Sequence, residues 1–464
     1  MDVVAQMKKL LEPKSVAVIG VSRAPMIIRG ATFDVLTNLI NSGYQGKIYP
    51  INPQASEIQG LKTYANIADA PADIDLAVIN LPRDSVPGIV RECIGKGIKA
   101  ITIVTQGFAE ADDEGKRLQR EIEHIIRGTD TRILGPNSLG TANGHINFNS
   151  SFVAAQIDKI PVGFMCQTGI FLIGLTGLKL VGKGMDLGNG CDVHFVDGLE
   201  YFEQDPETKV VGLHIEGMKH ASRFLKVASR VTCKKPIVAL KTGISQQAAQ
   251  AAQSHTGSLI GRSEVWSAAL KQAGMTKVND IEELSDTVSA FYTLPPMRGR
   301  RVGIITVTGG FGIIGIDACH KHGLYTAKPV PGTINRLSAL YPHWQNPDNP
   351  ADIWPAIQIA KKASPFKVLE KATIALLDDP GVDAVLCILY AISPAFTIDL
   401  HQLVQKAARS HTDKPLVFFL YGPFATEVKD KLEANSKTMA FPSPDRAMRA
   451  LGHLADYSEF LAKS

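Results

Sequence analysis

Short apolar segments alternate with longer segments of helical periodicity along the whole chain. The apolar segments are rich in Val and Ile, as in "SVAVIG" (15–20), "VGFMC" (162–166) and "RVGIITV" (301–307). Each of these three runs into a loop with glycine or hydroxyl residues and then into a helical segment. Strands that alternate with helices are typical of parallel α/β sheets, whose ligands gather at the carboxyl ends of the strands. Further strands are expected at 46–53, 74–82, 98–108, 131–137, 209–217, 236–243, 384–392 and 415–422.

Two segments interrupt this pattern. The segment 138–152 is rich in Gly, Asn and Ser, and "TLPPMRGR" (293–300) combines two prolines with a basic cluster. A chain of 464 residues has room for roughly three domains of about 150 residues. We therefore expect three α/β domains, at 1–145, 146–296 and 297–464.

Composition and charge exclude several classes of function. The net charge is only +4 over 49 basic and 45 acidic residues, without a dense basic block, so no nucleic-acid partner is expected. The N-terminal segment lacks the apolar core and cleavage site of a signal peptide. The most apolar long stretch, 163–182, contains Gln, Thr, Lys and several glycines, which is not typical of a membrane span. The six cysteines show no CxxC spacing and the histidines no metal-ligand spacing, so we expect a cytoplasmic protein without a metal site of its own.

The first strand ends in a loop suited to a nucleotide-like ligand. Gly20 and Ser22 follow the strand where backbone N–H groups can hold a phosphate. A GxGxxG fingerprint is missing, and the second strand ends in Asn52 and Pro53 where a dinucleotide site has an acidic residue, which argues against NAD. A tight glycine turn without a ligand is an equally good interpretation of this loop alone. The case for a ligand improves because other strand ends should converge on the same crevice, at Pro82, Gly107 and Asn137.

The stretch "AAQSHTGSLIG" (251–261) places His255 among hydroxyls and glycines. An imidazole that carries a phosphoryl group needs a fixed tautomer, which a carboxylate on its Nδ1–H can provide. Glu216 ends the strand "VVGLHIEG" in the same predicted domain. Helix N-termini can balance the phosphate charge, and the glycine-rich loops at 166–169 and 308–312 are two candidates. Taken singly, a surface histidine and a solvated strand-end carboxylate are the more ordinary interpretations.

These motifs together carry a family resemblance. "SVAVIG", "GKIYPINP", "GF-E" (Gly107, Phe108 and Glu110), "RILGPN" and "SHTG" follow one another along the chain in the order found in NDP-forming acyl-CoA synthetases, with "IEG" upstream of "SHTG". The chain resembles the alpha subunit of an ADP-forming acetate–CoA ligase, a superfamily shared with succinyl-CoA synthetase, over essentially its whole length. The resemblance implies a Rossmann-like CoA-binding domain followed by two flavodoxin-like domains, of which the second contributes a phosphate-facing helix.

The resemblance also implies roles for individual residues. His255 corresponds to the phosphorylated histidine, and Glu216 to the carboxylate that holds it. After Ser22 the chain departs from the family pattern, and Arg23 or Arg29 could supply the charge for the CoA phosphates. The positions that match phosphate-binding residues are Gln167, Thr168, Gly169, Gly309, Gly310, Phe311 and Gly312. Those that match CoA-binding residues are Gly20, Ser22, Asn52, Pro53, Pro82, Gly107 and Asn137.

The activity implied by the resemblance converts acyl-CoA, ADP and phosphate into acid, coenzyme A and ATP through acyl phosphate and phosphohistidine. No ATP-grasp module is recognisable in the sequence, so ADP or ATP and Mg²⁺ would be bound mainly by a separate ATP-grasp beta subunit, in an α2β2 assembly. A succinyl-CoA synthetase-like ligase is one alternative, disfavoured because that alpha chain lacks the third domain. A non-catalytic CoA-binding regulatory protein is the other, disfavoured because His255 is present.

Overall fold

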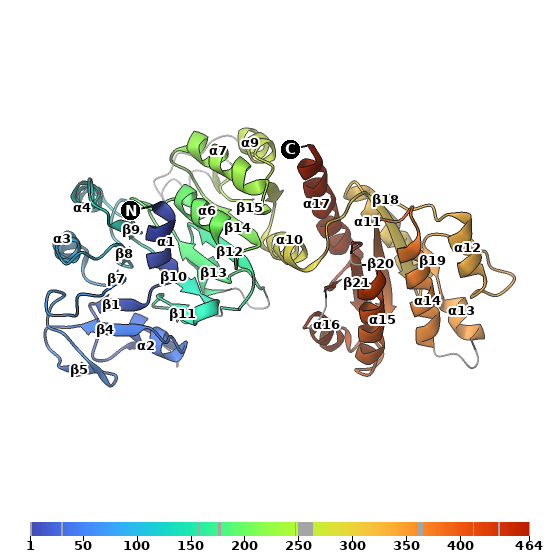
Figure 1. Cartoon of the computed structure of the whole chain (residues 1–464), viewed down its shortest axis with the longest axis horizontal. Coiled ribbons are helices and arrows are strands. Elements are labelled where there is room, and N and C mark those ends of the chain that lie inside the picture. Colours follow the sequence, from blue (N-terminus) through green and yellow to red (C-terminus); the bar gives the residue numbers. More distant parts are fainter. Residues whose placement is uncertain are drawn as a thin grey trace. The chain divides into compact units, whose positions relative to one another are not determined.

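The computed structural model describes residues 2–28, 31–155, 157–174, 178–245, 247–248, 263–360, 365–411, 413–434 and 437–463. The chain divides into two compact units, Met1–Val288 and Ser289–Ser464 (Figure 1). The first unit contains two mainly parallel sheets and the second contains one. The predicted α/β class is therefore confirmed, while the boundaries at 145 and 296 stay a prediction.

All three sheets share one strand order. When the parallel strands of each sheet are numbered along the chain, leaving aside β19 (Ala351–Asp352), which pairs only with β17 (Arg301–Thr306), the order is 2-1-3-4-5. The direction of winding therefore reverses between the first and third strands. In open α/β sheets this reversal opens a crevice at the carboxyl ends of those strands. The first sheet runs β4 (Lys47–Ile51), β1 (Ser15–Ile19), β7 (Leu76–Ile79), β8 (Ala100–Ile103) and β9 (Arg132–Leu134). The second runs β11 (Phe148–Asn149), β10 (Thr141–Asn143), β13 (Lys183–Asp186), β12 (Val162–Cys166), β14 (Val210–Ile215), β15 (Ile237–Lys241) and β16 (Thr276–Val278). The third runs β18 (Tyr325–Thr326), β17 (Arg301–Thr306), β20 (Ala384–Tyr390), β21 (Leu416–Tyr421) and β22 (Met439–Phe441), with β19 (Ala351–Asp352) also paired to β17.

Every strand segment predicted from the sequence contains a strand. Strands such as β1 and β12 are buried at every position, because helices cover both faces of a parallel sheet, and they therefore appear in the sequence as continuous apolar runs. The strands that the sequence did not reveal are short, and several carry polar residues, as β10 and β13 do. Two small hairpins, β2–β3 (Met26–Ile28, Ala31–Phe33) and β5–β6 (Glu57–Ile58, Leu61–Lys62), were also missed.

The helices alternate with these strands along both units. Those of the first unit are α1 (Val3–Leu11), α2 (Val35–Asn41), η1 (Arg83–Ser85), α3 (Val86–Gly95), α4 (Asp113–Ile125), η2 (Gly144–Ile146), α5 (Ile170–Ile173), α6 (Phe195–Gln204), α7 (Ala221–Thr232) and α9 (Ser263–Gln272), and α10 (Ile281–Thr293) spans the division. Those of the second unit are α11 (Gly309–Lys321), α12 (Pro331–Ser338), α13 (Trp354–Ile359), α14 (Pro365–Asp378), α15 (Phe396–Ser410), α16 (Ala425–Glu433) and α17 (Pro444–Lys463).

The polar segment 138–152 is part of the second sheet and is largely buried. Its side chains satisfy backbone groups that would otherwise be unpaired. Thr141 Oγ1 donates to Leu10 O at 2.8 Å and Asn143 Nδ2 donates to Leu11 O at 3.0 Å, so both cap carbonyls at the end of α1. The Gly, Asn and Ser content that indicated a seam in the sequence thus serves to anchor α1 to the second sheet.

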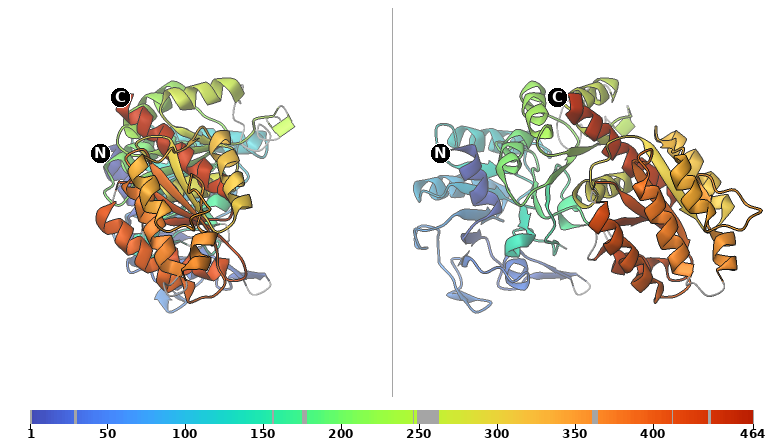
Figure 2. Two further views of the ribbon diagram at one scale, coloured as in Figure 1. Left: turned by 90° about the vertical axis from the view of Figure 1, so that its right-hand side faces the viewer. Right: turned by 45° about the vertical axis from the view of Figure 1, so that its right-hand side comes forward.

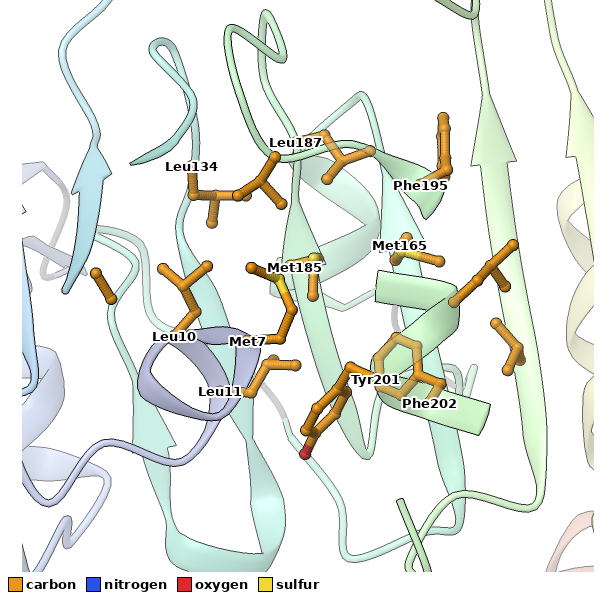
Figure 3. Packing of buried hydrophobic residues seen from close by; sticks show 14 of the residues in the cluster. Met7, Leu10, Leu11, Leu134, Met165, Met185, Leu187, Phe195, Tyr201 and Phe202 are labelled. Atoms are coloured by element: carbon orange, nitrogen blue, oxygen red, sulfur yellow. The ribbon is translucent and has the colours of Figure 1, made fainter. Parts of the chain in front are cut away.

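Helix α1 joins the two sheets of the first unit through a common core. Met7, Leu10 and Leu11 are fully buried, and they belong to one apolar cluster with Met185 of β13 and Tyr201 of α6. Figure 3 shows these side chains pointing toward one another between α1 and the second sheet. Because one core spans both sheets, the carboxyl ends of their strands are held in a fixed relation within the first unit.

In the second unit the sheet lies between two apolar clusters, one on each face. Figure 2 shows the helices that flank this sheet. Helices α14, α15 and α16 contribute to one cluster, and α11 and α17 contribute to the other. The side chain of Asn349, on the loop before β19, donates to Val302 O and Ala327 O at 2.9 and 2.8 Å and accepts from Ile304 N at 2.7 Å. Asn349 therefore ties the loop before β19 to β17 and to the residue that follows β18.

Candidate functional site

The crevice of the second sheet lies where β12 and β14 run side by side. Val162–Met165 pair in parallel with Val210–Leu213, so both strands reach the same edge of the sheet. The loop after β12 carries Gln167, Thr168 and Gly169, and β14 is followed directly by Glu216. Two groups of residues that were predicted separately, almost fifty positions apart, are therefore brought together at the reversal of the strand order.

Glu216 is held by two residues of the facing loop, Gln167 and Thr168. The backbone N–H groups of Glu216 and Gly217 donate to Gln167 Oε1, at 2.7 and 3.0 Å. The hydroxyl of Thr168 donates to Glu216 Oε1. Glu216 is only 8% exposed, so these hydrogen bonds fix a nearly buried carboxylate at the floor of the crevice. Gln167 was predicted to bind phosphate, but its side-chain oxygen accepts hydrogen bonds from the backbone N–H groups of Glu216 and Gly217.

Gly169 is required by close packing. A Cβ at this position would lie 2.4 Å from Leu139 Cγ and 2.9 Å from Asp186 Oδ2. Gly169 precedes α5, which spans only Ile170–Ile173 and ends at Gly174 with φ +91°. The helical segment expected after this loop is therefore only one short turn, because Gly174 takes a positive φ that a helix cannot continue through.

Buried ionisable groups surround the base of Glu216. Lys241, at the end of β15, donates through Nζ to Glu216 O at 2.8 Å, and burial lowers the pKa of this ammonium to about 8. Asp186, at the end of β13, accepts from Leu139 N at 2.7 Å and from Gly188 N at 3.2 Å. Burial raises the pKa of the Asp186 carboxyl to about 6, and the nearby charge of Glu216 acts in the same direction. The floor of the crevice is thus a low-dielectric region in which charges interact strongly.

A second histidine lies close to this floor but is unsuited to attack phosphorus. His214, in β14, is 3% exposed and stacks on Phe171 with ring centroids 4.4 Å apart. Its Nε2 lies 3.1 Å from Thr242 Oγ1, and burial lowers its pKa to about 4. The ring is neutral and enclosed, so it packs in the core. His255 itself lies outside the described residues, and its predicted role stays a prediction.

The second glycine-rich loop opens α11 in the second unit. Gly309 and Gly310 are exposed, whereas Gly312 packs closely against Pro350 and Thr306. The ring of Phe311 is partly buried and packs against two aromatic rings of β21, Phe419 and Tyr421, at centroid distances of 5.2 and 4.8 Å. The phosphate-binding role of Gly309–Gly312 stays a prediction, and it would be carried by backbone N–H groups at the start of a 13-residue helix.

The seven predicted CoA positions follow the five strands of the first sheet. Gly20 has φ +92°, and a Cβ there would lie 2.2 Å from Asn80 O, so only glycine fits between the ends of β1 and β7. Asn52 ties the end of β4 to that of β1 by donating from Nδ2 to Val21 O at 2.7 Å. Ser22 is exposed and bonds to Ala24 O. The remaining positions lie in the loops after β4, β7, β8 and β9, namely Pro53, Pro82, Gly107 and Asn137.

A hydrogen-bond chain connects this first crevice to the second. The carboxylate of Glu110 accepts from Gly107 N at 2.6 Å and from Phe108 N at 3.1 Å. The same carboxylate accepts from Nδ2 of Asn189, in the loop after β13. Asn189 N in turn donates to Pro136 O at 2.9 Å. Two of the predicted CoA loops and the loop after β13 therefore form one continuous rim in the first unit.

Sequence reasoning overlooked three residues of this site. Lys241 ends the apolar strand "PIVALK", and a lysine at the end of a fully buried strand is a signal that was available. Asp186 lies in a four-residue strand that has no periodicity to reveal it. Asn189 follows in "LGNG", where its contact with Glu110 depends on the packing of the two sheets.

Comparison with known proteins identifies the family. Residues 14–144 match the family described as "CoA binding domain", and residues 160–291 match "Succinyl-CoA ligase like flavodoxin domain". The chain is 34% identical to the acetate–CoA ligase (ADP-forming) I subunit alpha of Pyrococcus furiosus, over 98% of this chain and 99% of that protein. The chain belongs to the ADP-forming acetate–CoA ligase family.

One further relative and one solved structure are similar to this chain over 98% of its length. The acetate–CoA ligase (ADP-forming) II of Archaeoglobus fulgidus is 34% identical over 98% of this chain, which covers 68% of that protein. A solved structure of acetyl-coenzyme A synthetase 1 from Ca. Korarchaeum cryptofilum, in complex with phosphate and ADP, superimposes with a TM-score of 0.87. It is 30% identical and the match covers 98% of this chain and 97% of that one. The predicted fold and family are confirmed.

The described residues contain neither a membrane-spanning helix nor a cluster of metal-ligating side chains. Among the residues that the structure describes, no helix is long and apolar enough to cross a membrane. Within the same residues, no three His, Cys, Asp or Glu side chains come together as metal ligands would. Both Cys166 and Cys191 lie where burial raises the thiol pKa, which favours packing over a nucleophilic role.

Proposed function

We propose that this chain is the alpha subunit of an ADP-forming acyl-CoA synthetase of the acetate–CoA ligase type. The observation that carries the proposal is the arrangement of Gln167, Thr168 and Glu216, which fixes a nearly buried carboxylate at the crevice of the second sheet. Relatives that match the chain end to end are named ADP-forming acetate–CoA ligase alpha subunits, which supports the same activity.

The reaction runs in three balanced steps. An oxygen of phosphate attacks the thioester carbonyl, the C–S bond breaks, and the CoA thiolate leaves and takes up a proton. His255 then attacks the phosphorus of the acyl phosphate through Nε2, and the P–O bond breaks to release the carboxylate. Finally an oxygen of the ADP β-phosphate attacks the phosphorus, the P–N bond breaks, and ATP and neutral imidazole are formed.

Glu216 would act on the imidazole rather than on the phosphate. Its carboxylate can accept the Nδ1–H of His255, which leaves Nε2 unprotonated for attack and stabilises the positive charge that develops on the phosphorylated ring. Thr168 supports this role because its hydroxyl donates to Oε1 and keeps the carboxylate oriented. Lys241 lies behind Glu216, bonded to its carbonyl, and so places a positive charge near the acid.

The first sheet would bind coenzyme A at the carboxyl ends of its strands. Gly20 allows the backbone to approach a phosphate closely, and Asn52 fixes the neighbouring strand end. Arg23 is exposed and available to a CoA phosphate, while Arg29 lies outside the described residues. The rim through Glu110 and the loop after β13 would lead the thiol end toward Glu216.

The nucleotide would be bound by a partner. Close relatives are named as alpha subunits, which implies a separate beta subunit. We propose that this partner is an ATP-grasp chain that binds ADP or ATP with Mg²⁺, in an α2β2 assembly in the cytoplasm. A metal held there would neutralise phosphate charge, while the described residues of this chain supply the carboxylate.

Labelling of His255 tests the proposal. The chain, with and without its partner, is incubated with acetyl-CoA and labelled phosphate, and the label on protein is measured after acid and base treatment. We expect base-stable, acid-labile label that is lost in His255→Ala and reduced at least tenfold in Glu216→Gln. Coenzyme A binding without label in any combination would favour the non-catalytic alternative, and label that persists in His255→Ala would refute the assignment.

A further inference from the structure

A small cavity lies beside the crevice of the second sheet, on the other side of Gln167. It is lined by the loops that follow β12, β13 and β14 and by the first turns of α6 and α7, and it is partly open. Gln167 and Gly217 line one side of it, and Asn189 lines another. Its wall is mainly apolar and is formed by Leu187, Phe195, Val196, Met218 and Phe224.

The cavity lies close both to the predicted CoA loops and to Glu216. Gln167 accepts the backbone N–H of Glu216, so the cavity is separated from the catalytic carboxylate by one side chain. Asn189 donates to Glu110, whose carboxylate also holds the backbone of Gly107 in the predicted CoA loop. The cavity therefore lies between the loop expected to hold coenzyme A and the residues expected to accept the phosphoryl group.

The chemistry of the reaction requires an acyl pocket in such a place. The thioester carbonyl must lie between the CoA sulfur and the attacking phosphate, so the remainder of the acyl group points away from both. An alkyl group is stabilised by apolar walls and by the exclusion of water. Of the lining residues, Leu187, Phe195 and Val196 are nearly fully buried and provide a rigid apolar surface.

We propose that this cavity receives the alkyl part of the acyl group and that Met218 sets the length of chain that fits; the inference rests on the proposed function. The cavity volume is about 20 Å³, and one water-sized group needs about 10–15 Å³. A methyl group fits in this space, and we expect a propyl or aryl group to fit less well because Met218 would have to move. The substrate class is a short, unbranched carboxylic acid, and the limit is steric.

Met218 is the adjustable part of the wall. It follows Glu216 and Gly217 directly, is partly buried, and packs against the main apolar cluster of the first unit. The next residue, Lys219, donates through Nζ to Gly190 O at 3.3 Å. This hydrogen bond joins the loop after β14 to the loop after β13, and both loops line the cavity. Methionine is unbranched and fills irregular space, so its truncation enlarges the cavity without removing a hydrogen bond.

The test compares acids of increasing length with the chain in complex with its partner subunit. CoA-thioester formation is measured with acetate, propionate and butyrate in the wild type and in Met218→Ala. One methylene that does not fit costs roughly 10–200-fold in kcat/KM. We expect the butyrate-to-acetate ratio of kcat/KM to rise at least tenfold in Met218→Ala, with the KM for coenzyme A within twofold. Val196→Ala, which removes another part of the apolar wall, should change the ratio in the same direction, and Leu461→Ala, at an exposed position of α17, serves as the control.

The possible outcomes separate the two proposals. If the wild type forms no thioester with any acid, the proposed function fails. If the wild type is active and neither Met218→Ala nor Val196→Ala changes the ratio by more than twofold, the acyl pocket is wrong and the proposed function stands. A wild type that uses butyrate as well as acetate overturns the size limit directly.

Discussion

Gln167 offers the sharpest test of how Glu216 is positioned. Its Oε1 accepts two backbone N–H groups, those of Glu216 and Gly217, and Gln167→Ala removes the acceptor for both. A buried donor left without a partner costs about 1–3 kcal/mol. Gln167 is partly exposed, so water can replace some of the lost bonding and the cost should be near the lower end, about 2 kcal/mol for the pair. That value corresponds to a roughly 30-fold change in a local opening equilibrium.

Hydrogen–deuterium exchange of a peptide that covers 213–219 measures this opening directly. We expect exchange at Glu216 and Gly217 to be about 30-fold faster in Gln167→Ala, and labelling of His255 to slow by at least tenfold. Gln167→Glu is the matched control, because it retains an acceptor oxygen and should keep the exchange slow while the added charge beside Glu216 still slows labelling. If Gln167→Ala exchanges within twofold of the wild type and labels normally, the reasoning is refuted.

Two further predictions concern the rest of the first unit. Gly20→Ala forces a side chain into a backbone with φ +92° and places its Cβ 2.2 Å from Asn80 O, so we expect the protein to lose at least about 1–2 kcal/mol of stability and CoA binding to become undetectable by calorimetry. Gly88→Ala, in α3 with open space around it, is the control and should be neutral or stabilising. A Gly20→Ala protein with wild-type stability and CoA binding would contradict the packing argument. The raised pKa of Asp186, about 6, means that the folded state binds its proton more tightly than the unfolded state. Its contribution to stability is therefore complete below about pH 4 and lost as the pH rises toward 6, at up to about 1.4 kcal/mol per pH unit. Urea titrations should show Asp186→Asn gaining stability relative to the wild type between pH 4 and 6, and parallel pH profiles of the two proteins would rule this out.

From the amino-acid sequence alone, the long buried strands and the positions of the candidate site residues along the chain could be predicted. Strands of parallel sheets are buried on both faces, so β1, β12 and β17 appear as continuous apolar runs that need no knowledge of the fold. Residues such as Gly20 and Glu216 follow these runs directly, and the rule that ligands bind at carboxyl ends made them candidates. Family motifs could then assign a role to each position.

Tertiary structure decided which of these residues touch and what each side chain does. Gln167 holds the backbone of Glu216 because β12 and β14 are neighbours, and strand order is set by how helices pack rather than by local pattern. Asp186 and Asn189 lie in segments too short to show a period, and their environments come from loops of other strands. The polar segment 138–152 has the composition of a domain boundary, but it is largely buried. Thr141 and Asn143 donate hydrogen bonds to backbone carbonyl groups at the end of α1. The burial of a residue and its hydrogen-bond partners depend on segments that are distant in the sequence and meet only in the fold, so neither can be predicted from the local sequence.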